Sequence, residues 1–353
     1  MLGADADLDQ GYVRYGSAEA KEATSEMKRF GHAGLPRSDG LGMAPLSEGD
    51  LQDIHLASLE VLERTGMWVE AEDARDVFAD GGCKVDHDTC MVRLPPDVVE
   101  GAIRSAPPLI RWCGRDPAND IILGGDRSAF MNFGEAIMIN DLHTGENRET
   151  ATADVGDICT IVDWASEIDV YEAAITPRDC PQHVATVHHF AAALPSMTKP
   201  MMFGPLSELE LEACIDMAAS VVGGRDQLRE RPIVGFGVCT VSPLQLPRQA
   251  TDISLGTARA GLPHSVLAMC MAGGSSPQTL AGTLVLHNAE VLAGITLLQL
   301  AVRGAPVIYS SSTTAMDLRL GAASVGTPET GLLNACVGQV ARRYGIPSWV
   351  AGL

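Results

Sequence analysis

Basic residues are scarce in this chain of 353 residues. Lysine and arginine together number 25 against 45 aspartates and glutamates, which gives a formal net charge of −20 at pH 7. A chain with this excess of acid is repelled by phosphate backbones and by anionic lipid surfaces. The composition therefore argues against nucleic acid and membranes as partners, whereas a small cationic substrate would be attracted.

Closely spaced cysteine pairs are also missing. The nine cysteines are scattered, and no two of them form a C-x-x-C motif. This distribution is typical of reduced, mostly buried thiols in a cytosol. The nearest approach to metal-ligand spacing is Cys83, His87 and Cys90 in one polar turn. This single group in a polar turn is weak support for a zinc site, and we predict no metal site.

The first residues, MLGADADLDQ, lack the basic start and apolar core of a signal peptide. Apolar runs such as 292–302 are shorter than the roughly 20 residues that a membrane-spanning helix needs. We therefore expect a cytoplasmic protein. Residues 1–45 are polar and weakly periodic, and we expect them to form a poorly ordered arm or an oligomerisation arm.

The pattern over residues 46–125 predicts an N-terminal helical segment. A helix should begin after Pro45, where Ser47 can cap it and Asp50 can complete a capping box, and it should end at Gly66. The further elements expected are a helix over 71–79, a hairpin over 85–94 and a helix that starts at Pro96.

Over residues 126–353, short β-rich runs alternate with longer amphipathic stretches. This alternation is typical of repeated strand–helix units and predicts an α/β fold, a TIM (β/α)8-type barrel. Such a barrel needs eight strands, but only seven can be found, so we expect it to lack its last strand or strands. The candidate strands are 129–133, 170–175, 200–203, 232–238, 264–269, 306–309 and 347–351.

The stretch APVIYSSSTTAMDLRLGAASVGTPE, residues 305–329, combines an apolar strand with a hydroxyl-rich loop. Barrels bind their ligands at the carboxyl ends of the strands, where this loop begins. Asp317 and Glu329 add negative charge to it. A solvated turn with two surface acids is the alternative interpretation. The hydroxyls belong to Ser310, Ser311, Ser312, Thr313 and Thr314.

Three blocks in this region, PVIYSSSTT at 306–314, MDLRLG at 316–321 and GTPE at 326–329, resemble the trimethylamine:corrinoid methyltransferase family. Ser310 departs from the family, which usually has glycine there. The resemblance extends from about residue 51 to the end of the chain. Further matching blocks are RDP at 115–117, GGD at 124–126, DLHTGENRET at 141–150, PRDCP at 177–181, MAGGSSP at 271–277 and HNAEVLAG at 287–294.

The resemblance implies an activity and its partners. Members of the family transfer a methyl group from trimethylamine to the Co(I) corrinoid of a separate corrinoid protein, in methylamine catabolism or methanogenesis. The chain is therefore expected to bind no cofactor of its own, to act on a small methylated amine and to form a homo-oligomer. We predict Glu329, Asp317 and Glu135 as catalytic acids beside the ammonium cation. The predicted substrate-binding residues are Tyr309, Ser310, Ser311, Ser312, Met316 and Trp349.

Two alternatives stay open. A family member without pyrrolysine would demethylate a quaternary amine such as glycine betaine and would share nearly all these blocks. A truncated, non-catalytic fragment would bind the corrinoid protein without turnover.

The family also implies a test on the gene. In pyrrolysine-containing members this residue follows a strand like PSWVAG, which is found here at 347–352, and Leu353 stands just before its position. We expect an in-frame UAG codon after Leu353, followed by a segment like SDSK. Sequencing the genomic region checks this, and a different stop codon or no such downstream frame would contradict it.

Overall fold

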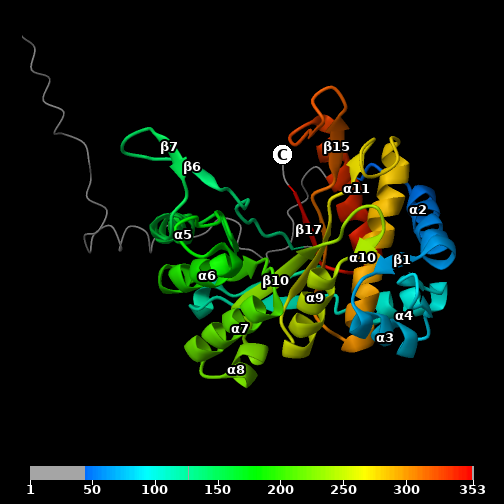
Figure 1. Cartoon of the computed structure of the whole chain (residues 1–353), viewed down its shortest axis with the longest axis horizontal. Coiled ribbons are helices and arrows are strands. Elements are labelled where there is room, and N and C mark those ends of the chain that lie inside the picture. Colours follow the sequence, from blue (N-terminus) through cyan, green and yellow to red (C-terminus); the bar gives the residue numbers. More distant parts are fainter. Residues whose placement is uncertain (1–43, 126, 352–353) are drawn as a thin grey trace, which may run out of the picture.

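A curled parallel sheet lies at the centre of the molecule, with helices packed around its outer face (Figure 1). The computed structural model describes residues 44–125 and 127–351. Nearly all of the expected arm, Asp126 and Leu353 lie outside these residues. Six strands pair in the order β17–β14–β12–β10–β9–β8, so the strands of this sheet lie side by side in the order in which the chain forms them. Their bounds are β8 Tyr171–Glu172, β9 Met201–Phe203, β10 Val234–Cys239, β12 His264–Ala268, β14 Val307–Ser311 and β17 Ser348–Val350.

Helices alternate with these strands, which confirms the predicted α/β fold with its strand–helix repeats. The expected strand over 129–133 is wrong as a regular strand, because it contributes only one bridge, from Met131 to Val170. Between the described residues, no pairing joins β17 to the region of Met131, so the sheet is open there. The helices are α5 Thr152–Trp164, α6 Ala185–Ser196, α7 Glu208–Val222, α8 Arg225–Glu230, α9 Arg248–Ala260, α10 Leu280–Ala301 and α11 Pro328–Tyr344.

The N-terminal segment has the predicted elements. Ser47 and Asp50 form the capping box at the start of the first helix, which continues through a π-helical turn to Gly66. A small sheet ties the segment to the rest of the chain, because β1 pairs with both β3 and β11. The elements are α2 Glu48–Glu60, the turn Val61–Thr65, β1 Met67–Val69, α3 Glu72–Asp80, β2 Lys84–Asp86, β3 Met91–Arg93, α4 Pro96–Ser105 and β11 Gln245–Leu246.

Side chains of the large sheet alternate between its concave side and the helix layer, as the pleat of a strand requires. Ile308 of β14 and Met202 of β9 belong to an apolar cluster on the concave side. Val307 and Tyr309, which flank Ile308 in the sequence, belong to a second apolar cluster, between the sheet and the helices on its outer face. An antiparallel hairpin fills one end of the concave side through the same inner cluster. It consists of β4 Ile110–Trp112 and β5 Ile121–Leu123.

Helix α10 is buried on almost every side between the sheet and the N-terminal helices. It runs for 22 residues, longer than the apolar run found in the sequence, and among the described residues it is the one helix long and apolar enough to cross a membrane. However, 83% of its most apolar window is buried inside the molecule. Its Glu290 is satisfied by Thr240, Ser242 and the Leu244 N–H. The helix is therefore a core element here, which makes its length and composition weak support for a membrane span.

Lys199, in the loop before β9, is a buried cation with a structural role. Its side chain is 3% exposed, and Nζ donates to the carbonyls of Val162, Ala165 and Ile168 at 2.6–2.7 Å. These carbonyls lie at and beyond the end of α5, where a helix leaves carbonyl groups without partners of its own. The lysine thus joins α5 to the sheet.

We predict that Lys199→Met lowers the free energy of unfolding by about 3 kcal/mol, because three carbonyls, one of them fully buried, lose a charged donor. Urea unfolding followed by circular dichroism measures the change. Lys84→Met is the matched control, since Lys84 is exposed on β2. Equal stability of the two variants would contradict the structural role of Lys199.

Candidate active site

Two glutamates, Glu135 and Glu172, meet at the concave side of the sheet. Glu172 lies on β8, at the same register as the inward-facing Met202 of β9. Burial, together with the negative charge of Glu135, raises the pKa of Glu172 to about 7. Glu135 is reached by solvent, yet the surrounding protein desolvates its carboxyl group and raises its pKa as well. The concave side therefore holds two interacting acids, and at neutral pH one of them is near its titration midpoint.

The Glu172 carboxyl group has one oxygen without a partner. Oε2 is buried and has no hydrogen-bond partner among the described residues. A buried carboxylate oxygen without a donor is costly, so such a group stays protonated or takes up a cation. The site is suited to bind positive charge.

Glycines leave room beside the acids. A Cβ atom on Gly204 would lie 3.7 Å from Glu135 Oε1 and 3.8 Å from the carbonyl oxygen of Gly237. A side chain at Gly204 would therefore contact both the carboxylate of Glu135 and a carbonyl oxygen, so the glycine lets these oxygens lie close together. Such a cup of oxygen atoms favours a small organic cation over an anion.

Cys239, at the end of β10, is exposed and lies close enough to Glu135 and Glu172 to interact with both. Desolvation and the charges of Glu135 and Glu172 raise the pKa of its thiol to about 11. The thiol is therefore protonated at neutral pH, and it does not have the low pKa of a nucleophilic cysteine.

Three predicted substrate-binding residues, Ser310, Trp349 and Ser312, follow the concave side of β14 and β17. Ser310 pairs with Trp349 in register, and its Oγ accepts a 2.6 Å hydrogen bond from Ser265. Trp349 packs against the inner apolar cluster. Ser312, the next residue of the same parity, is half-buried. Their roles as substrate contacts stay predictions.

Tyr309 and Ser311 face the other way. Tyr309 is fully buried in the helix layer, where its hydroxyl donates to Asn288 Oδ1 of α10 at 2.8 Å. Ser311 is also buried, and its Oγ accepts from the Thr313 N–H at 3.1 Å. Neighbouring side chains of a strand point to opposite faces, so these two lie on the side of the sheet away from Ser310. Their predicted roles as substrate contacts stay predictions.

Asp317, Met316 and Glu329 lie in the protruding region around β15 and the start of α11 (Figure 1). Asp317 Oδ1 accepts from the backbone N–H groups of Arg319 and Leu320 in the turn between β15, Thr314–Asp317, and β16, Ala322–Ala323. Met316 packs against Gly274, and Glu329 is exposed in the first turn of α11. No interaction in the described part of the chain joins these side chains to Glu135.

Of the two acids that meet here, the sequence analysis names Glu135 and does not name Glu172, and the catalytic role of Glu135 stays a prediction. A signal for Glu172 was present, because VYEAAI places a carboxylate inside an otherwise apolar strand. An acid at an interior strand position is expected to be paired or functional.

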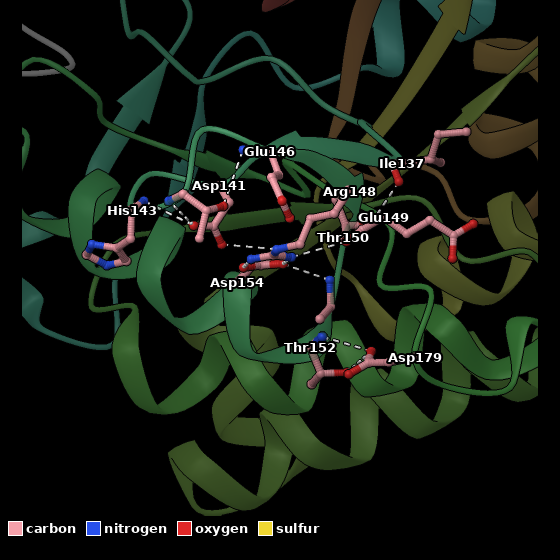
Figure 2. Close-up of polar contacts among 12 residues, drawn as sticks. Ile137, Asp141, His143, Glu146, Arg148, Glu149, Thr150, Thr152, Asp154 and Asp179 are labelled. Carbon is pink, nitrogen blue, oxygen red and sulfur yellow. Dashed lines mark hydrogen bonds and ion pairs between the residues drawn. The ribbon is translucent and has the colours of Figure 1, made fainter.

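The segment DLHTGENRET after Glu135 is a hairpin locked by ion pairs (Figure 2). Arg148 bonds Asp141 through Nε at 3.1 Å and Asp154 of α5 through both terminal nitrogens at 2.7 and 2.8 Å. Backbone N–H groups of Thr144 and His143, together with Arg148, lower the pKa of Asp141 to about 2. This block therefore fixes the loop on α5. The hairpin strands are β6 Met138–Asn140 and β7 Asn147–Glu149.

No group of three or more His, Cys, Asp or Glu side chains suited to hold a metal ion occurs within 44–125 and 127–351. The absence of a metal site stays a prediction.

The model of the trimethylamine methyltransferase (MTTB) family matches residues 14–353. The chain belongs to this family. It is 43% identical to trimethylamine methyltransferase MttB of Desulfitobacterium hafniense over 328 residues, which cover 93% of the chain and 66% of that protein. Identity to trimethylamine methyltransferase MttB1 of Methanosarcina mazei is 38%, over 91% of the chain and 66% of that protein. Glycine betaine methyltransferase of D. hafniense is 32% identical over 87% of the chain and 64% of its own length.

The chain thus spans 66% of the length of its trimethylamine methyltransferase relatives in the family. Solved structures support the fold alone. The hydroxylamine complex of MtmB superposes with a TM-score of 0.54 at 13% identity, covering 91% of this chain and 69% of that one. Monomethylamine methyltransferase MtmB of Methanosarcina barkeri gives a TM-score of 0.53 at 13% identity, covering 94% and 70%.

We predict that Tyr309→Phe lowers the free energy of unfolding by about 1–2 kcal/mol, because Asn288 loses its hydrogen-bond donor. The same change should leave the binding of tetramethylammonium unaltered, since Tyr309 faces the helix layer. Thermal unfolding and titration calorimetry measure the two effects. Weaker binding without loss of stability would contradict the placement of Tyr309 in the helix layer and would favour its predicted role as a substrate contact.

Proposed function

We propose that this chain forms the catalytic part of an enzyme that transfers a methyl group from trimethylammonium to the Co(I) corrinoid of a partner protein. Membership of the trimethylamine methyltransferase family supports the reaction class. The observation that carries the proposal is the buried, unpartnered Glu172 oxygen beside a second acid, Glu135. A cation in this cup would supply the missing partner.

The role proposed for the two glutamates is electrostatic. During transfer the C–N bond breaks, the methyl group goes to cobalt, and the electron pair stays on nitrogen, which leaves dimethylamine. Nitrogen is a good leaving group only while it carries positive charge. Carboxylates that hold the ammonium ion and its proton in a partly desolvated site keep the donor in this state and orient one methyl group toward the mouth.

Glycine betaine is the second candidate donor, because a glycine betaine methyltransferase is among the relatives. Its carboxylate would be repelled by Glu135 and Glu172, and the site offers no compensating cation among the residues that interact with them. The acid pair therefore favours an amine without a carboxylate. A side-by-side titration with trimethylammonium and glycine betaine separates the two donors.

The remaining expectations belong to this proposal. The corrinoid would stay on the partner protein, the chain would bind no cofactor of its own, and the working form would be a cytoplasmic homo-oligomer whose (β/α)8-type barrel lacks its last strand or strands. The division into an arm over 1–45, a segment over 46–125 and a barrel part over 126–353 is proposed with it. Methylation of cobalt, followed by its absorbance with a purified corrinoid protein, tests activity against the alternative of a non-catalytic binding fragment.

The pH dependence of cation binding tests the site. Tetramethylammonium keeps its charge at every pH, so any change with pH comes from the protein. Because the folded-state pKa of Glu172 is raised to about 7, its carboxylate is lost as pH falls through that value. We predict that binding strengthens between about pH 6 and about pH 8. Glu172→Gln should remove this dependence and weaken binding on the order of tenfold at the higher pH.

Glu146→Gln is the matched control. Glu146 is exposed in the turn between β6 and β7, so this substitution removes the same charge at a position away from Glu135 and Glu172. Titration calorimetry of the three proteins across this pH range is the measurement. Binding that is flat with pH in the unmodified chain, or equally strong in Glu172→Gln, would refute the proposed cation site.

A further inference from the structure

The segment from Met131 to Ala136 runs beside β8 and pairs with that part of the chain at its two ends, but not between them. Met131 pairs with Val170, and Ala136 pairs with Ile175, with the same spacing on both segments. The register is therefore kept across the interruption, although the backbone pairing is not. Glu172 lies inside this interval.

The side chain of Asn132 occupies the place of the missing backbone partner. Its Oδ1 accepts from the Glu172 N–H at 3.0 Å, and its Nδ2 donates to the Glu172 carbonyl at 2.7 Å. In a parallel ladder, alternate residues direct both backbone groups to the same neighbouring strand. The backbone does this on either side of the gap, where Val170 N–H donates to Phe130 and Ala136 N–H donates to the Ala174 carbonyl.

Without backbone pairing at this point, the main chain after Asn132 packs directly on the residues at and just beyond the end of β8. A Cβ atom on Gly134 would collide with the carbonyl oxygen of Ala173 and approach Cγ of Glu172 to 3.7 Å. This close approach delivers Glu135 to the side of Glu172. The two carboxyl groups and the Cys239 thiol of β10 are the titratable groups that interact there among the described residues.

We propose that Asn132 is a positioning residue: its amide replaces the strand backbone at Glu172 and so places Glu135 beside Glu172 in one site. The significance of this placement for catalysis rests on the proposed function. The placement itself does not, because it can be measured without any amine.

The test is the electrostatic coupling between the two acids. The titration of Glu172 is followed by NMR of 13C-labelled glutamate side chains, with the resonance assigned by its loss in Glu172→Gln. In the unmodified chain, Glu135→Gln should lower the Glu172 midpoint, because it removes a like charge. In Asn132→Ala the same Glu135→Gln change should leave the midpoint unmoved, since the carboxyl groups have separated.

Asn147→Ala is the matched control, because Asn147 donates to Asn140 in the nearby hairpin and touches neither acid. Its coupling should equal that of the unmodified chain. Asn132→Ser, which is too short to span both backbone groups, replaces Asn132→Ala if the latter does not fold. Full coupling in a folded Asn132 variant overturns the proposal.

Binding of tetramethylammonium separates this inference from the proposed function. Loss of coupling with a weakening of binding of about tenfold or more supports both. If Asn132→Ala abolishes the coupling but the unmodified chain does not bind tetramethylammonium, the positioning role is supported and the proposed cation site is refuted.

Discussion

The hydrogen-bond pairing of parallel strands is the constraint on which the site depends. Each strand must offer its backbone groups alternately to its two neighbours, and each side chain must follow the same alternation between concave side and helix layer. This is why Glu172, Ser310 and Trp349 share one side of the sheet. Where the pairing fails, at the segment around Met131, a side-chain amide completes it and the main chain is free to bring a second acid to the first.

Much of the scaffold could be predicted because its signals are local. The capping box of Ser47 and Asp50, the helix that starts at Pro96 and the alternation of strands with helices each depend on a few adjacent residues. The strand over 129–133 failed as a regular strand for a different reason. Whether Asn132 bonds through its backbone or its side chain depends on Glu172, 40 residues away, and periodicity does not contain that information.

The site was harder to predict from the sequence than the fold. The serine-rich stretch predicts hydroxyl groups at the carboxyl end of one strand, and that strand divides Tyr309 and Ser310 between opposite faces. The charge of Asp317 makes it a candidate in the sequence, but its carboxylate accepts hydrogen bonds from two backbone N–H groups of its own turn. Glu172 lies outside the serine-rich stretch, and the signal that marks it is a single carboxylate within an otherwise apolar strand. Alternate residues of a strand point to opposite faces. Assigning each residue of the candidate strands to one face separates Tyr309 from Ser310 and marks Glu172 as the acid on its face.

The unpartnered oxygen of Glu172 has a thermodynamic consequence. A desolvated acid without a donor makes the folded chain less stable than the same scaffold with a neutral side chain would be, and the deficit grows as the group ionises. Any cation that fills the cup recovers this free energy in addition to its own contacts, and only the folded state can bind it. With the cation site as proposed, resistance to unfolding rises with the concentration of the small cation, so the heat tolerance of the protein would report how much of that cation surrounds it.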